Sequence, residues 1–501
     1  MPVQRTMTVL AVILAAIVVS QEVQASDWSP DVMFKDVVDL MMANLFNIPG
    51  TIFGLSHNLG GVAEGTLVES FPCKPGPGED HDACRNISEL IRSRGFEVEN
   101  YEVTTEDGYI LAIQRVINPL VDLENRRKLK AVILQHGIAG ISDEWVINSQ
   151  YARPTPWPPE QQNSDGTDDS EADEFESEEE EDRRHPRSLA FYLANRGYDV
   201  FLPNSRGNRY SQNHVSKSVS EPSFWDFSWD ELIDYDLPAT IRVVQQISRK
   251  EKIPYVGWSQ GSTIMFGLLA ERPEYTDIIE PYIAFAPVAY MHHMRSPVRL
   301  ITPMVPFVRD LNMGVASSNA FTHRLSQVCG PTEARMSTCL NFANQLYGDH
   351  SEAFDIHRLQ TITHHIPAGC SFKSIAHYGQ EVLSKKFARY NLGLHGNKAR
   401  YGTEFPPEYN LTNIQSKSIV LFSADNDYLA APEDVQLLVS QLGVPPMKWF
   451  NMTQEDPNWN HMDYVYHKKA GKLINPLVAE ILDRFNHDSR PDVCSCKRKS
   501  G

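Results

Sequence analysis

Gly257-Trp258-Ser259-Gln260-Gly261 is a G-x-S-x-G pentapeptide, preceded by an apolar run of four residues and followed closely by another of seven. The first run predicts a buried strand and the second a helix, so the serine falls at a strand-to-helix turn. The serine backbone is strained at such a turn, and both glycines are needed because a Cβ there would collide with the neighbouring strand or helix. We expect the turn to present the Ser259 hydroxyl as a nucleophile.

A carboxylate and a histidine follow in the chain order that a serine hydrolase with a strand-to-helix nucleophile turn requires. Residues 418–422 read as a buried strand, and the turn-rich segment after it contains Asp425 and Asp427. Spacing favours Asp427 as the orienting acid but leaves Asp425 open. His461 lies in a loop before a helical stretch and is the expected base, which takes the serine proton and returns it to the leaving alcohol.

A fourth element lies upstream of the pentapeptide. Residues 129–134 predict a strand, and the glycine-containing segment 135–140 follows it. Acyl transfer places negative charge on the carbonyl oxygen, and two backbone N–H groups can stabilise that charge. The expected donors are the amides of Ile138 and Gln260.

Metal, cofactor and nucleic-acid chemistry find little support in the sequence. The pairs His292-His293 and His364-His365 are the metal candidates, but no Cys or carboxylate stands near them at zinc-like spacing. A serine triad supplies its own nucleophile, so we expect no cofactor and no metal. The sequence shows no basic patch beyond the short tail Lys497-Arg498-Lys499, which does not support a nucleic-acid role.

Several blocks spread along the chain share a distinctive pattern: 86–91, 101–111, 197–200, 204–208, 286–288, 367–369, 426–432 and 460–463. They resemble the acid lipases, the family that includes gastric and lysosomal acid lipases. The resemblance covers roughly residues 66 to 486. It implies an α/β-hydrolase fold, with a mostly parallel central sheet and an inserted, mainly helical lid. It also implies the triad Ser259, Asp427 and His461, and so settles Asp427 over Asp425.

The activity implied by the resemblance is hydrolysis of carboxylic esters of neutral lipids, triacylglycerols or sterol esters, through an acyl-serine intermediate. Three positions depart from the family pattern: Trp258 replaces a histidine, Cys370 a threonine or serine, and Ala431 an aspartate. Trp258 lies beside the nucleophile, so substrate preference is the property most affected. A catalytically idle lipid-binding or storage protein is the alternative outside the enzymes.

The domain organisation follows from the long separation between nucleophile and acid. A single strand-helix crossover needs far fewer residues, so we expect residues 290–415 to form a lid over the site. The core then comprises residues 66–289 and 416–487. Apolar stretches of the lid such as 300–308 would cover a substrate pocket and face a lipid emulsion or membrane surface. Oligomeric state is left open.

The N-terminal sequence has the pattern of a signal peptide and predicts that the protein is exported. Residues 1–25 carry a basic residue, a short apolar run and a small residue at Ala25, as signal peptides do. Residues 26–65 form an amphipathic extension or pro-segment, and residues 488–501 a tail. The sequence contains no second apolar segment long enough for a transmembrane anchor, so the mature chain is expected to be secreted or lysosomal. Sequons at Asn86, Asn410 and Asn451 are glycosylation candidates.

Seven cysteines fit an oxidising compartment. Cys73 and Cys84 form a plausible short disulfide loop. Cys329 and Cys339 lie close together in the lid, at a position similar to the disulfide of the family. The connectivity of Cys370, Cys494 and Cys496 stays open, although Cys370 fits a buried small apolar residue.

An acidic insertion interrupts the first core segment at about 155–186. Twelve residues of the tract 165–182 are Asp or Glu, and they contribute much of the formal net charge of −18. Such a composition predicts disorder. The acidity of the chain therefore describes this insertion and not the catalytic surface.

Overall fold

A central β-sheet organises the protein in the computed structural model, which describes residues 80–157, 177–308, 310–315, 319–330 and 332–485. All of these residues belong to the unit Val68–Gly501. The predicted signal peptide, N-terminal extension and C-terminal tail lie outside the described residues. No described helix is both long and apolar enough to cross a membrane.

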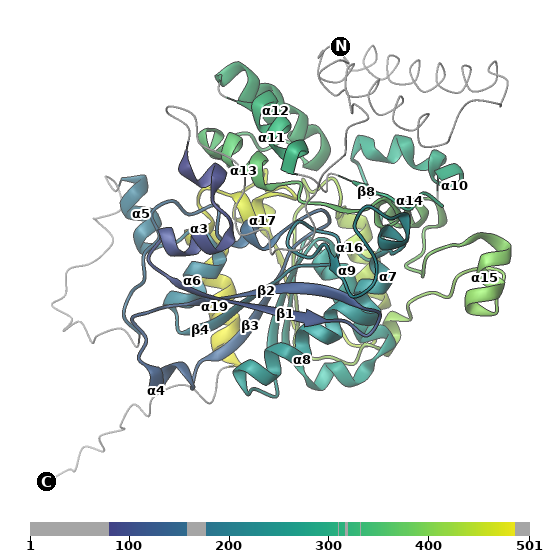
Figure 1. The fold of residues 1–501 in the computed structure, drawn as a ribbon, viewed down its shortest axis with the longest axis horizontal. Helices are drawn as coiled ribbons and strands as arrows, with labels where there is room; N and C mark the ends of the chain where they lie inside the picture. The colour runs from purple at the N-terminus through teal and green to yellow at the C-terminus, as the bar shows by residue number, and fades with distance from the viewer. Residues whose placement is uncertain (1–79, 158–176, 309, 316–318, 331, 486–501) are drawn as a thin grey trace, which may run out of the picture. The chain divides into compact units, whose positions relative to one another are not determined.

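The described residues form a nine-stranded sheet in the order β1-β2-β4-β3-β6-β7-β10-β11, with β5 paired to β2 (Figure 1). The strands from β4 to β11 are all parallel, while β1 and β2 are antiparallel to their neighbours. The mostly parallel sheet expected from the sequence is confirmed. The strands are β1 Glu97–Thr104, β2 Tyr109–Ile117, β3 Lys130–Gln135, β4 Tyr198–Pro203, β5 Asn213–His214, β6 Ile253–Trp258, β7 Ile279–Phe285, β10 Ile419–Ser423 and β11 Lys448–Asn451.

The central strands β3, β4, β6, β7 and β10 are buried on both faces, and alternate residues of each strand point to opposite sides. On β3, Val132 and Leu134 join one hydrophobic cluster, and Ala131 and Ile133 join the other. The first cluster packs against α3 (Ile87–Ser93), α6 (Leu189–Asn195) and α19 (Asn475–Arg484), and the second against α8 (Leu237–Ser248) and α9 (Gln260–Glu271).

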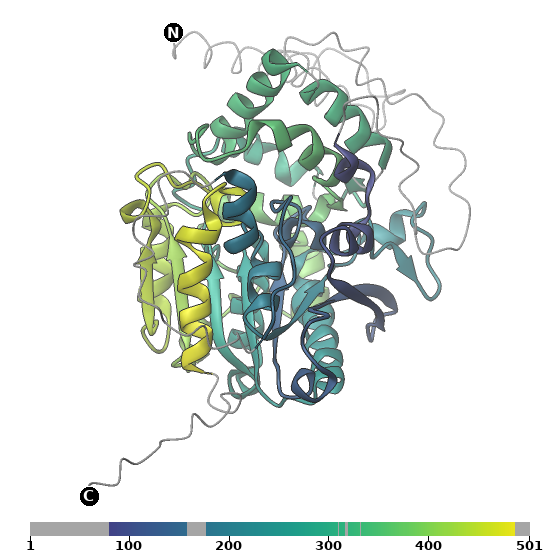
Figure 2. The ribbon, with the colours of Figure 1, turned by 90° about the vertical axis from the view of Figure 1, so that its left-hand side faces the viewer.

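The chain between β7 and β10 leaves the sheet, and the regular elements of its described residues are helices apart from the short pair β8 (Gly314–Val315) and β9 (Cys370–Ser371). It contacts the loops at the carboxyl ends of the strands, since the Ala368 amide donates to the Ala139 carbonyl oxygen at 2.6 Å. Both ribbon views place α11, α12 and α13 above this edge (Figures 1 and 2). The helices are η8 Pro297–Met304, α10 Val305–Val308, α11 Asn319–Cys329, α12 Glu333–Tyr347, η9 Ile356–Arg358, α13 Leu359–His365, α14 Phe372–Ser384, α15 Gly393–Tyr401 and η10 Leu411–Asn413.

Shorter elements complete the core around the strands. They are η2 His81–Cys84, α4 Leu123–Arg126, η3 Ser142–Trp145, η5 Pro222–Trp225, α7 Trp229–Glu231, η6 Leu232–Asp236, η7 Pro273–Asp277, α16 Pro432–Gln441, η11 Met452–Gln454, α17 Asp463–Tyr466 and α18 Ala470–Leu473.

The acidic insertion differs from its expected disorder at its C-terminal end, where Glu178–Arg184 forms helix α5. The Ser177 side chain caps the helix, and four glutamates occupy the first turn, where the helix dipole favours negative charge. Asp182 is buried and accepts hydrogen bonds from Ser149 Oγ at 2.7 Å and from the Tyr151 amide at 2.7 Å. The disorder predicted from composition is therefore wrong for this end of the insertion, because the Asp182 side chain is buried among hydrogen-bond donors.

Candidate active site

The G-x-S-x-G segment forms a tight turn between β6 and α9. Ser259 has φ 54° and ψ −114°, a backbone conformation that L-residues rarely adopt. A Cβ at Gly257 would lie 2.5 Å from the Gly261 carbonyl oxygen, and a Cβ at Gly261 would lie 2.6 Å from the Gln135 carbonyl oxygen. Both glycines are therefore required by close backbone approach, as the sequence predicts.

His461 lies between the serine and a carboxylate. Its Nε2 is 2.9 Å from Ser259 Oγ, and its Nδ1 is 2.9 and 3.0 Å from the two carboxyl oxygens of Asp427. The three residues are 202 and 34 positions apart in the chain, so the fold brings them together from three loops. A proton can pass along this line from the hydroxyl to the imidazole while the carboxylate orients the ring.

Backbone amides fix the carboxylate. Asp427 is fully buried, and its Oδ1 accepts hydrogen bonds from the amides of Leu429 at 2.9 Å and Ala430 at 2.8 Å. Asp425, the alternative that spacing left open, is exposed and accepts from the Asn451 side chain instead. The geometry thus brings Asp427 to His461.

The segment after β3 lies directly against the serine. Gln135 pairs with Gly257, and a Cβ at Gly137 would lie 3.4 Å from Ser259 Cβ. Ile138 belongs to this loop, and Gln260 is the first residue of α9, whose amide has no acceptor within the helix. Gln260 thus directly follows the nucleophile and Ile138 follows Gly137, while the oxyanion role of their amides stays a prediction.

Trp258 ends β6 beside the nucleophile and is 5% exposed. Its indole Nε1 donates a hydrogen bond to the His461 carbonyl oxygen at 3.0 Å, and the two rings are 5.7 Å apart. The sequence points to an effect on substrate preference at this position. The structure adds a contact to the backbone of the histidine loop, and the effect on substrate preference stays a prediction.

A buried carboxyl supports the loop that contains Ile138. Glu144, in η3, is 3% exposed, and a Cβ at Gly140 would lie 2.7 and 2.9 Å from its two carboxyl oxygens. Burial, reinforced by the neighbouring Asp143 charge, raises the pKa of Glu144 well above its usual range. Burial therefore favours the neutral form of the carboxyl where it packs on the loop backbone.

The histidine pairs that suggested metal binding have separate partners. His293 Nδ1 lies 2.8 Å from Asp434, and His365 Nδ1 lies 2.6 Å from Asp143. His364 Nε2 lies 2.9 Å from Ser326 Oγ. Neither pair gathers a set of metal ligands among the described residues.

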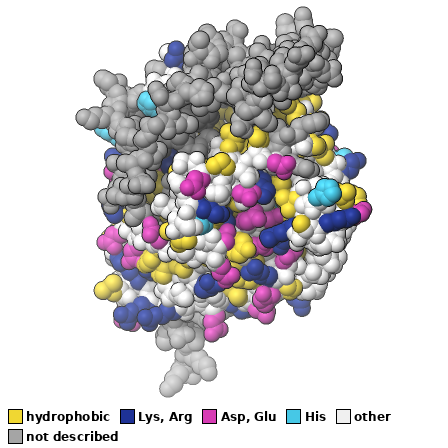
Figure 3. Space-filling model, turned by 45° about the vertical axis from the view of Figure 1, so that its right-hand side comes forward, with side chains coloured by type: hydrophobic (Ala, Val, Ile, Leu, Met, Phe, Trp, Pro, Cys, Tyr) yellow, Lys and Arg dark blue, Asp and Glu magenta, His cyan; other side chains and the backbone are white. Residues whose placement is uncertain are grey.

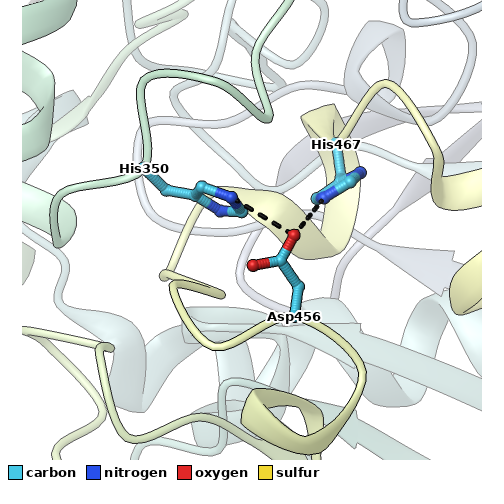
Figure 4. Close-up of side chains that lie close together, drawn as sticks. All are labelled: His350, Asp456 and His467. Carbon is cyan, nitrogen blue, oxygen red and sulfur yellow. Dashed lines mark ion pairs between the residues drawn. The ribbon is translucent and has the colours of Figure 1, made fainter.

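One other cluster has metal-like spacing, and the sequence did not reveal it. The ligand atoms of His350, Asp456 and His467 all lie within 4.8 Å of one another (Figure 4). However, His467 Nδ1 accepts a hydrogen bond from the Lys469 amide at 2.9 Å, so in the neutral ring the proton is on Nε2, the atom that faces Asp456. A metal ligand needs the lone pair of that nitrogen. The donor set therefore fits hydrogen bonding to Asp456 and not a cation.

The predicted disulfide between Cys329 and Cys339 is present, with Cα atoms 5.5 Å apart. Cys84 is also disulfide-bonded, while Cys73 lies outside the described residues, as do Cys494 and Cys496. Cys370 is a buried free thiol, and burial raises its pKa to about 12, so it is not a thiolate nucleophile.

The three sequons differ in exposure. Asn410 is exposed and Asn451 partly exposed. Asn86 is 8% exposed and forms a capping box with Glu89 at the start of α3. Asn86 is therefore the poorest glycan acceptor of the three in the folded chain.

The surface shows no wide field of one charge on the face drawn in Figure 3, where basic and acidic side chains are interspersed. This agrees with the inference that the net charge belongs largely to the insertion. A nucleic-acid surface would require clustered basic residues.

Comparison with known proteins gives concordant results. Residues 87–149 match the partial alpha/beta-hydrolase lipase region, and residues 180–468 match the alpha/beta hydrolase fold. The chain is 32% identical to gastric triacylglycerol lipase of Rattus norvegicus, over 81% of this chain and 93% of the relative. It is 31% identical to the lysosomal acid lipase/cholesteryl ester hydrolase of Homo sapiens, over 80% and 91%. The chain therefore belongs to the acid lipase family of α/β-hydrolases.

Proposed function

We propose that this protein is a serine hydrolase that cleaves the carboxylic ester bonds of neutral lipids, triacylglycerols or sterol esters. The observation that carries the proposal is the position of His461, 2.9 Å from Ser259 Oγ and 2.9 Å from Asp427. The named activities of the gastric and lysosomal relatives support the substrate class.

In the acylation step, Ser259 Oγ attacks the ester carbonyl carbon while His461 Nε2 takes its proton. The amides of Ile138 and Gln260 stabilise the oxyanion. When the C–O bond breaks, His461 returns the proton to the leaving alcohol oxygen. In deacylation, His461 takes a proton from water, the hydroxide attacks the acyl carbon, and the proton passes to Ser259 as the fatty acid leaves.

The helical excursion of residues 290–415 acts as a lid in this account. Ser259 is only 7% exposed, so a lipid ester reaches it after the excursion moves. The excursion also presents partly exposed apolar side chains, Val298 at 38% and Leu300 at 39%. These side chains suit contact with an emulsion or membrane surface.

The proposed location is secretory or lysosomal. Residues 1–25 act as the signal peptide, in keeping with their sequence pattern. The Cys329–Cys339 disulfide suits an oxidising compartment. An idle lipid-binding protein is not favoured, since a hydrogen-bonded Ser-His-Asp line is what catalysis needs and storage does not.

A covalent probe tests the mechanism directly. A fluorophosphonate is expected to add once per chain, and peptide mapping is expected to place it on Ser259. Labelling should disappear in Ser259→Ala and persist in Ser440→Ala, a control at an exposed serine. Labelling of another residue, or none in folded wild-type protein, would refute the proposed nucleophile.

A further inference from the structure

The loop that carries His461 is held to the end of α12 by several contacts. The His461 amide donates to the Tyr347 carbonyl oxygen at 3.3 Å. The Asn460 side chain donates to the Gly348 carbonyl oxygen at 2.8 Å. The position of His461 therefore depends on the segment that immediately follows α12.

His350 belongs to that segment and lies between two carboxylates of the histidine loop. Its Nδ1 is 2.6 Å from Asp463 Oδ2. Its Nε2 is 3.4 Å from Asp456 Oδ2 (Figure 4). Asp456 precedes His461 in the chain and Asp463 follows it, so one imidazole contacts the loop on both sides of the catalytic histidine. Asp463 Oδ2 also accepts the Asn460 amide at 2.7 Å.

We propose that His350, as an imidazolium, is a positioning residue that holds the His461 loop in its catalytic geometry by bridging Asp456 and Asp463. The proposal rests on the function proposed above. It adds that the positive charge of His350, which is present in acid solution, maintains the position of the His461 loop.

The surroundings of His350 favour the charged ring. Burial acts to lower its pKa, but the hydrogen bond to Asp463 and the charges of Asp463, Asp456 and Glu352 outweigh burial and raise the pKa above 6.5. His467 also faces this group, yet burial and the His350 charge lower its pKa to about 4, so it stays neutral. One cation thus serves two carboxylates.

The direction of the pH effect follows from these shifts. The pKa of His350 is raised in the folded state, so its contribution is fully present below the unfolded value of 6.5 and is lost as pH rises through the folded value. On the acid side, burial raises the pKa of Asp463 above 3.8, and protonation there removes one partner. The bridge from His350 to Asp456 and Asp463 is therefore strongest in mildly acid solution.

The first test compares kcat of the full chain and of His350→Gln on a soluble p-nitrophenyl ester from pH 5 to 8. At pH 5 the variant is expected to be about 10- to 100-fold slower with little change in KM, because the histidine is misplaced and not the ester. The ratio of wild-type to variant kcat should fall toward one by pH 8. His395→Gln, at an exposed histidine, is the matched control and should give a ratio near one throughout.

A second variant guards against simple misfolding. Asp456→Asn keeps an oxygen for the Asn458 amide but removes the charge facing His350, so a smaller loss with the same pH dependence is expected. A kcat ratio that is unchanged between pH 5 and 8 for both variants would overturn the proposal.

Thermal unfolding provides a test that does not depend on activity. The Tm difference between wild type and His350→Gln should shrink as pH rises. If the wild type shows no hydrolysis but the Tm difference still shrinks as pH rises, the proposed function is contradicted, while the bridging role of His350 still stands.

Discussion

The indole Nε1 of Trp258 donates a hydrogen bond to the carbonyl oxygen of His461, across 3.0 Å and 203 positions of sequence. The residue before the nucleophile thus holds the backbone of the base. Together with the Tyr347 carbonyl oxygen, which accepts the His461 amide, it fixes the histidine from two sides.

Trp258→Phe tests this contact, because the variant keeps an aromatic ring and loses only the donor and part of the volume. The orphaned buried carbonyl is expected to cost about 1–2 kcal/mol of unfolding free energy. We expect kcat to fall about 10-fold with KM little changed, since the base moves and the ester pocket does not. Steady-state kinetics and urea unfolding measure both. Trp229→Phe is the control, because this indole is buried with no hydrogen-bond partner for Nε1. Equal kcat losses in the two variants would contradict the assignment.

Glu144→Gln tests the neutral carboxyl beneath the oxyanion loop. Because burial raises the pKa of Glu144 in the folded chain, the unfolded chain releases this proton first as pH rises above 4.5, and wild-type stability falls with rising pH. Glutamine does not titrate, so the variant should gain stability relative to wild type between pH 5 and 7, by at most about 1.4 kcal/mol per pH unit. Urea unfolding at the two pH values measures the change, with the exposed Glu180→Gln as control. A gain no larger than that of the control would show that Glu144 is charged in the fold.

Asp182→Ala tests the order found at the end of the acidic insertion. The Asp182 carboxylate accepts hydrogen bonds of 2.7 to 3.0 Å from Ser149 Oγ and from the amides of Tyr151 and Arg187. The substitution leaves these three donors without that acceptor. We expect a loss of about 2–3 kcal/mol in unfolding free energy. Glu180→Ala, an exposed acidic neighbour, should change it by less than about 0.5 kcal/mol. Two equally small effects would mean that α5 contributes nothing to stability.

The fold was largely predictable because its signals are local. The strands around residues 130–135, 253–258 and 419–423 are apolar runs bounded by turn residues, and the turn at Ser259 needs two glycines whose absent Cβ atoms leave room for backbone. The order of serine, acid and base is also readable along the chain. Spacing alone could not separate Asp425 from Asp427, because two residues in one turn differ only in the direction their side chains take.

Other features depend on contacts that no local pattern carries. His350 and Asp463 are 113 positions apart, and nothing near either residue marks the other as its partner. Two of the partners of Asp182, Ser149 and Tyr151, lie 33 and 31 positions upstream, so composition predicted disorder where a buried carboxylate contacts distant residues. The hydrogen bond from Trp258 to the histidine loop could not be read from the sequence, which shows adjacency to the serine but not the direction of the indole.

The most direct test of the central claim is hydrolysis of emulsified triolein and cholesteryl oleate from pH 4 to 8, by purified glycosylated protein and by Ser259→Ala. The account predicts release of fatty acid from at least one ester, and a loss of about 10³-fold or more in the variant. No hydrolysis of either ester by folded protein, or equal rates with and without the Ser259 hydroxyl, would contradict it.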